Sequence, residues 1–381
     1  MSFYIPEGTP PFITNAMVRV ERRLPVAGEV LERAGKRVEP EDIVAKAFVP
    51  APPQIINVAR LLAIAPAQVE RAMRREVNNR ITQNEVLART GVIGGRRCLS
   101  PVSGIITAVD STTGYVTVLP DPPTFELRAA IRGVVMEILP QAGVVIETPA
   151  AQVYGAFGVG KERSGVLRLI CIDPNEAVQT DQIDGRSRYA ILIGGSSITA
   201  AALSRAVREQ VSGIIVGGIE ESELRTFLGW NDLQAWRTGS GTWVFPNNER
   251  ATDPGLTLVV TEGFGTRPMS QPLFELLITH AGQEAFIEGL TRLRRPMARP
   301  RVVIPLPRSV GAQLELPRPQ LRPGAMVRRL DPRHLGVVAH VRSLPTQPRR
   351  IDIGIRVAAV EIMHEDGTTI WLPRTAVEVL G

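Results

Sequence analysis

Lysine is nearly missing from this chain. Only three of its 44 basic residues are lysines, Lys36, Lys46 and Lys161, so arginine carries almost all of the positive charge. A GC-rich genome favours arginine just as phosphate recognition does. The net charge of +6 is therefore no indication of nucleic-acid binding on its own.

Cysteine and histidine are also scarce. The two cysteines, Cys98 and Cys171, lie among apolar residues and form no C-x-x-C pair. A disulfide framework needs more cysteines than this, so we expect two buried free thiols. The four histidines show no metal-ligand spacing. We therefore predict no metal and no other cofactor.

Long apolar runs are absent as well. No stretch of 18 or more apolar residues occurs, so we expect no membrane-spanning helix and no membrane partner. The first residues lack the basic start and apolar segment of a secretory signal. These absences predict a cytoplasmic protein.

What the chain has in quantity is glycine and proline. Its 381 residues include 34 glycines and 31 prolines, and 44% of them are hydrophobic. This length is typical of two to four domains, and the composition favours many turns and short strands. We predict a multidomain protein of α/β plus β class.

Short strands with glycine at their corners fill residues 15–150. One run reads "VAGEVLERAGKRVEPEDIVAKA", and related patterns are "SPVSGIITAV" from Ser100 and "RGVVMEILPQAGVVIET" from Arg132. The first run resembles one half-motif of barrel-sandwich hybrid domains, and "SPVSGIITAV" resembles the second half-motif. This is the fold of biotinyl and lipoyl carriers and of RnfC-like subunits. The resemblance implies a barrel-sandwich hybrid over this region, with a short helical insert.

The carrier lysine is missing from that region. Carriers of this fold hold biotin or lipoate on a lysine at an exposed hairpin tip. No lysine occurs between Lys46 and Lys161, and Lys36 lies in a turn of the first half-motif. We therefore predict no covalent biotin or lipoate, and a rigid β module used for packing or docking.

Residues 151–186 contain a stretch that imitates a phosphate-binding loop. Gly155 to Lys161 fits G-x-x-x-x-G-K, but Glu162 stands where that loop needs Ser or Thr, and a strand follows where it needs a helix. We interpret this region as a Gly-rich β connection, in which glycine supplies positive φ.

Apolar strands alternate with helical patterns over residues 187–307, which predicts an α/β domain with a parallel sheet. We expect Ser196 or Ser197 to cap the first helix. Ligands of such sheets bind outside the carboxyl ends of the strands. The candidate ligand residues at these ends are Gly194, Gly195, Ser196, Ser197, Gly217, Gly218, Glu220, Thr261, Glu262, Gly263 and Gly265.

These strand ends leave two interpretations open. Gly-rich turns occur in any sheet of this kind, with or without a ligand. An enzyme would also need a titratable base, for which the candidates are Glu220, Glu262 and His280. His280 also fits a plain helix end, where a positive charge complements the dipole.

Positive charge gathers towards the C-terminus. Residues 291–350 hold 14 arginines against Glu315 and Asp331, a net of +12. Residues 308–323 read as an Arg/Pro linker. Residues 324–381 predict about five short strands, and "MVRRLDPRHLGVVAHV" resembles the KOW motif of SH3-like small barrels. Such motifs contact RNA or protein.

The resemblance implies RNA contacts on this barrel. Arginines would bind phosphates and a tryptophan would stack on a base. The alternative is that the arginines merely coat the surface and the tryptophan fills the core. The candidate residues are Arg328, Arg329, Arg333, His334, Arg342, Arg349, Arg350 and Trp371.

Two functions are therefore consistent with the sequence. The first is a non-catalytic modular binding or scaffold protein that docks a protein or RNA partner. The second is a small-ligand-binding or enzymatic α/β domain, with its site at strand ends 194–197, 217–220 and 261–265.

Overall fold

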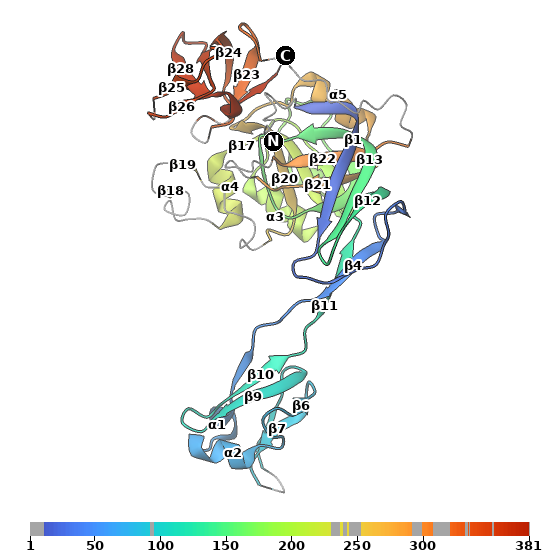
Figure 1. Cartoon of the computed structure of the whole chain (residues 1–381), viewed down its shortest axis with the longest axis vertical. Coiled ribbons are helices and arrows are strands. Elements are labelled where there is room, and N and C mark those ends of the chain that lie inside the picture. The colour runs from blue at the N-terminus through green and yellow to red at the C-terminus, as the bar shows by residue number, and fades with distance from the viewer. Residues whose placement is uncertain are drawn as a thin grey trace.

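A large body, a separate small domain and a two-stranded arm between them make up the molecule (Figure 1). The computed structural model describes residues 11–91, 95–229, 253–291, 299–307, 321–331, 334, 336–352 and 354–380, and the backbone of strands β18 (Arg237–Thr238) and β19 (Thr242–Trp243). Strands dominate it. None of the helices in these ranges combines the length and apolar character needed to cross a membrane.

One mixed sheet organises the body. Four of its strands, β15, β16, β17 and β20, run parallel and lie side by side in chain order. The alternating pattern predicted β16, β17 and β20, but the prediction of a parallel sheet over residues 187–307 holds only in part, because β21 and β22 pair antiparallel. Antiparallel strands flank them on both sides. The full order is β14 (Phe157–Val159), β20 (Thr257–Phe264), β17 (Gly213–Ile219), β16 (Ala190–Ile193), β15 (Arg163–Leu169), β21 (Glu284–Glu288), β22 (Arg301–Pro305), β13 (Gly143–Tyr154), β12 (Gly133–Leu139) and β3 (Arg37–Val38), with β1 (Phe12–Arg23) on β13.

Helices cover both faces of the parallel strands. Leucines of α3 (Ala200–Arg208) and α4 (Glu221–Leu228) join the hydrophobic cluster on one face, and those of α5 (Gln271–Thr279) join the other. The fully apolar run of β16 suits a strand that is buried on both sides. The predicted cap of α3 was wrong: Thr199 caps it, accepting a hydrogen bond from the Ala202 amide at 3.2 Å.

A two-fold pseudo-repeat builds the part of the body next to the arm, which we call the proximal β module (residues 12–48 and 124–154). In its first half, β2 (Glu29–Val30) pairs with β4 (Ile43–Phe48), and in its second half β12 pairs with β13. β3 of the first half crosses to β12 of the second. β11 (Thr124–Arg128) of the second half pairs with β4 of the first, so each half contributes a strand to the sheet of the other.

Equivalent glycines mark the same corner in each half of this module. A Cβ on Gly28 would overlap the carbonyl oxygen of Lys46, and one on Gly133 would lie 2.6 Å from that of Glu147. The residues that follow these glycines pair with Lys46 and Glu147 in the same register. Close backbone approach therefore requires glycine at both corners.

A separate hydrophobic core lies in residues 54–120, which we call the inserted domain. Its buried side chains contact one another and do not belong to the cluster of the proximal β module. It contains β5 (Gln54–Asn57), α1 (Val58–Leu62), η1 (Pro66–Gln68), α2 (Val69–Ala72), β6 (Arg80–Ile81), β7 (Val86–Arg89), β8 (Arg97–Leu99), β9 (Gly104–Asp110) and β10 (Tyr115–Pro120).

This second core corrects the sequence interpretation of residues 15–150. The run "SPVSGIITAV" was assigned to the second half-motif, but it forms the turn after β8 and most of β9 in the inserted domain. The segment that mirrors the first half is residues 124–148. Glycine between β-branched residues is common to both segments, so the pattern alone did not distinguish them.

Prolines stiffen the arm that joins the inserted domain to the body. After the last β4–β11 pair, the Val49 amide donates to the Pro123 carbonyl at 3.0 Å. Beyond it the two connections read "PAPPQ" and "LPDPP". Proline-rich segments are extended and semi-rigid, which suits a spacer.

The C-terminal sheet is a half-barrel with its own small core, and we call it the C-terminal barrel. Five strands pair in the order β28 (Thr369–Pro373), β27 (Ala359–Met363), β24 (Val338–Ser343), β23 (Met326–Arg329) and β29 (Val377–Val379), and η5 (Arg374–Ala376) precedes the last. The predicted turn at Asp366-Gly367 joins β27 to β28, with Gly367 at φ 79°. A hairpin of β25 (Arg349–Arg350) and β26 (Arg356–Val357) lies beside them.

Two predicted boundaries change. Residues 151–186 are not a mere connection, because the end of β13, all of β14 and all of β15 are strands of the large sheet, followed by η2 (Thr180–Gln182) and η3 (Gly185–Ser187). Gly160 does supply a positive φ of 98°, as the turn interpretation requires. Most of the predicted linker at 308–323 lies outside the described residues.

Candidate functional site

The strand ends predicted to bind a ligand are filled by the chain's own backbone. A Cβ on Gly217 would overlap the carbonyl oxygen of Arg267, and one on Gly218 that of Gly265. A Cβ on Gly195 would overlap the carbonyl oxygen of Glu176, and one on Gly194 would lie 2.5 Å from the Val178 side chain. Close packing of neighbouring loops therefore explains these glycines.

The serine and glutamate candidates at this edge, Ser196, Ser197 and Glu220, have different surroundings. Ser196 is buried and its hydroxyl donates to the Asn175 carbonyl at 2.8 Å. The Ser197 carbonyl accepts from the Val178 amide at 2.8 Å, while Glu220 is exposed at the start of α4. The partners of Ser196 and Ser197 are backbone groups of a neighbouring loop, and Glu220 points to solvent apart from them.

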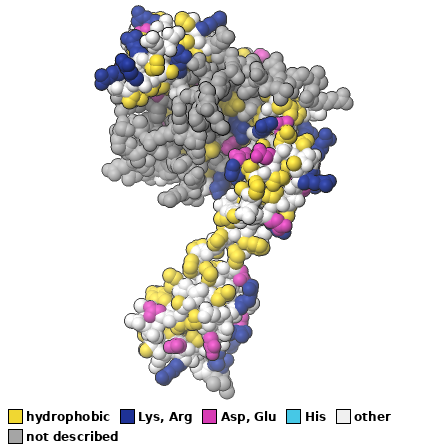
Figure 2. Space-filling model, viewed as in Figure 1, with side chains coloured by type: hydrophobic (Ala, Val, Ile, Leu, Met, Phe, Trp, Pro, Cys, Tyr) yellow, Lys and Arg dark blue, Asp and Glu magenta, His cyan; other side chains and the backbone are white. Residues whose placement is uncertain are grey.

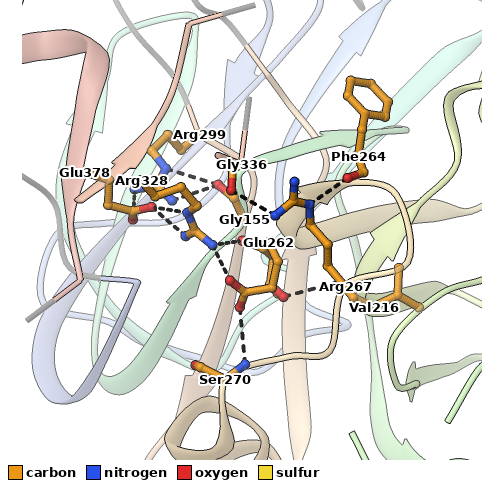
Figure 3. Close-up of polar contacts among 11 residues, drawn as sticks. Gly155, Val216, Glu262, Phe264, Arg267, Ser270, Arg299, Arg328, Gly336 and Glu378 are labelled. Carbon is orange, nitrogen blue, oxygen red and sulfur yellow. Dashed lines mark hydrogen bonds and ion pairs between the residues drawn. The ribbon is translucent and has the colours of Figure 1, made fainter. Parts of the chain in front are cut away.

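A buried ion-pair network joins this edge to the C-terminal barrel (Figure 3). The guanidinium of Arg328 donates to Glu262 at 2.6 Å and to Glu378 at 2.5 and 2.8 Å. Arg299 donates to the other oxygen of Glu378 at 2.5 Å and to the Gly155 carbonyl at 2.9 Å. Glu262 and Arg328, predicted to serve different ligands, therefore bind each other.

The charges in this network set the ionisation of its central carboxylate. Glu378 has no exposed side-chain surface, and burial alone would raise its pKa. The guanidinium groups of Arg299 and Arg328 outweigh that effect and hold the pKa of Glu378 below its ordinary value. Glu378 is therefore ionised at neutral pH and pairs with both arginines, while Glu262 supplies the second negative charge of the network.

Backbone contacts tighten the same junction. The Arg267 side chain donates to the Phe264 carbonyl at 2.7 Å and to the Gly336 carbonyl of the barrel at 3.2 Å (Figure 3). A Cβ on Gly336 would overlap the Glu262 carbonyl oxygen. The barrel thus sits on the carboxyl end of β20, which holds Thr261, Glu262 and Gly263, with Gly265 directly after it.

Two predicted RNA contacts are wrong, because the side chains are buried. Arg328 is 1% exposed and Arg329 is 3% exposed. Arg329 donates to both oxygens of Asp331, at 2.5 and 2.8 Å, and meets ring nitrogens of His334 and His364. A phosphate could reach neither guanidinium without breaking these contacts. Arg333 lies outside the described residues.

Three other predicted contacts come together in a row across the barrel. Trp371 on β28 lies directly opposite Glu361 on β27, and the Glu361 carboxylate is 3.8 Å from Arg342 on β24. The guanidinium of Arg349 lies 4.0 Å from the ring centroid of Trp371. Arg342 and Arg349 are exposed and Trp371 is half-buried, so this row faces solvent.

The hairpin beside this row adds a charge that the sequence did not suggest. Arg350 on β25 lies directly opposite Arg356 on β26, and both are exposed. No ion pair joins either one to a carboxylate within the described residues. Cross-strand pairing brings Arg356 into the set, and a lone arginine after "DIGI" gave no sign of it.

Cys98, Cys171 and His280 are in ordinary structural settings. Burial, chiefly, raises the pKa of Cys171 to about 11, so its thiol stays protonated at neutral pH. Both cysteines are buried and free, as predicted. His280 ends α5 and its Nδ1 lies 3.1 Å from the Gln283 side chain. Across the described ranges, no three His, Cys, Asp or Glu side chains gather as metal ligands.

The fold and site define a mostly-β protein, with a large mixed sheet and a basic, Trp-containing surface on its C-terminal barrel. Comparison of the sequence with protein-family models and with curated proteins gives no match.

Proposed function

We propose that this chain is a non-catalytic modular binding protein that engages RNA through its C-terminal barrel. The contact surface, which we call the barrel basic surface, consists of Arg342, Arg349, Arg350, Arg356 and Trp371. The body holds this surface at one end and the inserted domain at the other.

The observation that carries the proposal is that the Arg349 guanidinium lies over the Trp371 ring, beside Arg350 and Arg356, which face each other across strands and have no carboxylate partner in the described chain. A guanidinium plane over an indole is a platform on which an unstacked RNA base can lie. The flanking guanidinium groups reach phosphates on either side. Together they suit single-stranded RNA.

The position of the C-terminal barrel, at the carboxyl end of β20, also supports a binding role. Its buried ion pairs occupy the edge at which α/β sheets hold small ligands. They also fix the orientation of the barrel on the body, so that the barrel basic surface is presented rigidly. We therefore favour macromolecular docking over a small-molecule site at residues 194–197, 217–220 and 261–265.

The finer domain assignments belong to this proposal. The pseudo-repeat with glycine corners at Gly28 and Gly133 supports a barrel-sandwich hybrid, and the strand order of the C-terminal barrel supports an SH3-like KOW module. In carriers of the first fold, the lysine lies at a hairpin tip. Here the β4–β11 hairpin opens to hold the inserted domain, so the module presents a domain in place of a prosthetic group.

Titration of the full chain with a fluorescent single-stranded RNA, followed by anisotropy, tests the proposal. We expect the double variant Arg349→Gln, Arg350→Gln to bind about tenfold more weakly, with the salt slope lower by roughly 0.7 for each lost phosphate contact. The matched control is Arg208→Gln, Arg322→Gln, which removes equal charge from exposed positions elsewhere.

Two results would contradict the proposal. One is an equal loss of affinity in the control, which would reduce the effect to net charge. The other is no RNA binding at low salt, in which case native mass spectrometry for a bound small molecule becomes the deciding measurement between the two functions.

A further inference from the structure

Five arginines gather at the distal end of the inserted domain. We call them the distal basic surface, and Figure 2 shows Lys and Arg side chains at that end of the molecule. Four are exposed and one, Arg89, is half-buried. They come from α2, the segment after it, the end of β7, and the first residue of β8 with the residue before it: Arg71, Arg74, Arg89, Arg96 and Arg97.

Carboxylates do not neutralise this surface. Two other arginines of the same domain form ordinary ion pairs, Arg75 with Glu85 at 2.7 Å and Arg80 with Asp121 at 2.6 Å. In contrast, no ion pair links any member of the distal basic surface to a carboxylate of the described chain. Its positive charge is therefore left for an outside partner.

The placement of these arginines opposes folding. Arg89 on β7 lies directly opposite Arg97 on β8. The Arg74 amide donates to the Leu87 carbonyl at 2.9 Å, which brings a third arginine alongside. Like charges that face each other across strands destabilise a hairpin. A bound polyanion would turn this repulsion into a favourable interaction.

We propose that the distal basic surface binds the phosphate backbone of double-helical nucleic acid. Guanidinium groups match phosphate oxygens in a two-pronged geometry that lysine lacks. No aromatic residue occurs between Phe48 and Tyr115, so this surface has no stacking platform for unpaired bases. The chemistry is that of backbone contact, which DNA and RNA duplexes share.

The arm makes this surface reachable. It extends the inserted domain away from the body, and its proline-rich connections keep it extended (Figure 1). A rod-like duplex can therefore approach the distal end without meeting the body. This site is independent of the barrel basic surface, which suits single strands.

The test is anisotropy of the full chain with labelled duplex DNA, duplex RNA and the matching single strands. We expect duplex binding to weaken about tenfold or more in Arg89→Gln, Arg97→Gln, with the salt slope lower by about 1 per arginine. The matched control, Arg75→Gln, Arg80→Gln, removes the same charge from ion-paired positions and should keep wild-type affinity. Whichever duplex binds more tightly, DNA or RNA, is the nucleic acid that this surface prefers.

Measuring Tm alongside duplex binding distinguishes a loss of binding from a loss of folding. Arg97→Glu places opposite charges across the hairpin, so we expect its Tm to rise while duplex binding falls. The proposal is overturned by equal losses in variant and control, by no duplex binding at low salt, by tighter binding to single strands, or by tighter binding to phosphatidylserine vesicles. The Arg349→Gln, Arg350→Gln variant should keep duplex affinity, so failure here and failure of the RNA proposal are distinguishable.

Discussion

At the scale of single residues, neighbours decide what a charge does. Arg328 was predicted to contact RNA and Glu262 to contact a ligand, yet the two side chains lie 2.6 Å apart, with Arg328 fully buried and Glu262 mostly buried. Buried ion pairs of this kind fix an orientation more than they add stability. Removing one partner is costly, because the other charge stays buried.

Replacing Glu378 tests the strength of this junction. Glu378→Gln leaves Arg299 and Arg328 facing each other without a carboxylate between them. We expect the free energy of unfolding to fall by about 3–5 kcal/mol in urea denaturation. Glu361→Gln, whose carboxylate is 3.8 Å from an exposed Arg342, is the control and should cost less than about 1 kcal/mol. Equal effects would contradict the buried network.

The Glu378 carboxylate also makes the stability of the folded protein depend on pH in the acid range. Because the pKa of Glu378 is lower in the folded state, its contribution to stability is present above the unfolded value of about 4.5 and is lost as pH falls through the folded value. We expect Tm to drop below roughly pH 4.5, and to drop less steeply in Glu378→Gln. A variant with the full wild-type acid slope would assign that slope to other carboxylates.

At the scale of elements, the hydrophobic pattern predicted the strands of the large sheet better than it predicted the domain boundaries. Apolar runs that end in glycine identified β16, β17 and β20 correctly, because parallel strands are buried on both faces. The sequence could not show that residues 54–120 form a separate domain inserted between the two parts of the proximal β module. That depends on β4 pairing with β11, which a chain read in order does not reveal.

The corner glycines offer a symmetric test of the pseudo-repeat. Gly28→Val and Gly133→Val each place side-chain atoms against a facing carbonyl oxygen. We expect each to destabilise the protein by about 1–3 kcal/mol in thermal or urea unfolding. Gly185→Ala has open space around it and should change little. Loss at only one of the two corners would argue against equivalent halves.

Removing the inserted domain tests its independence. We expect a chain in which an Asn-Gly turn replaces residues 49–123 to fold, because that turn suits a β4–β11 hairpin. It should keep single-stranded RNA binding and lose duplex binding. Residues 49–123 alone should give a cooperative unfolding transition, since they have their own core. Aggregation of both parts would show that the arm carries stabilising contacts.

At the scale of the whole molecule, the C-terminal barrel and the inserted domain, which carry the two basic surfaces, lie at opposite ends of a long structure (Figure 1). The sequence located one of them through the arginine excess at 291–350, although two of its predicted residues are buried. It gave no sign of the other, because the arginines of the inserted domain are spread over its length with acidic residues among them. Only the fold separates Arg75 and Arg80, which are paired, from those that are not.

The most direct measurement is photo-crosslinking of the full chain to a thiouridine-containing single-stranded RNA, with mass-spectrometric mapping of the attached peptides. The account predicts crosslinks in the 349–357 hairpin and at Trp371, reduced in Arg349→Gln, Arg350→Gln. Crosslinks at strand ends 194–197 or 217–220, or no saturable crosslinking at low salt, would contradict it.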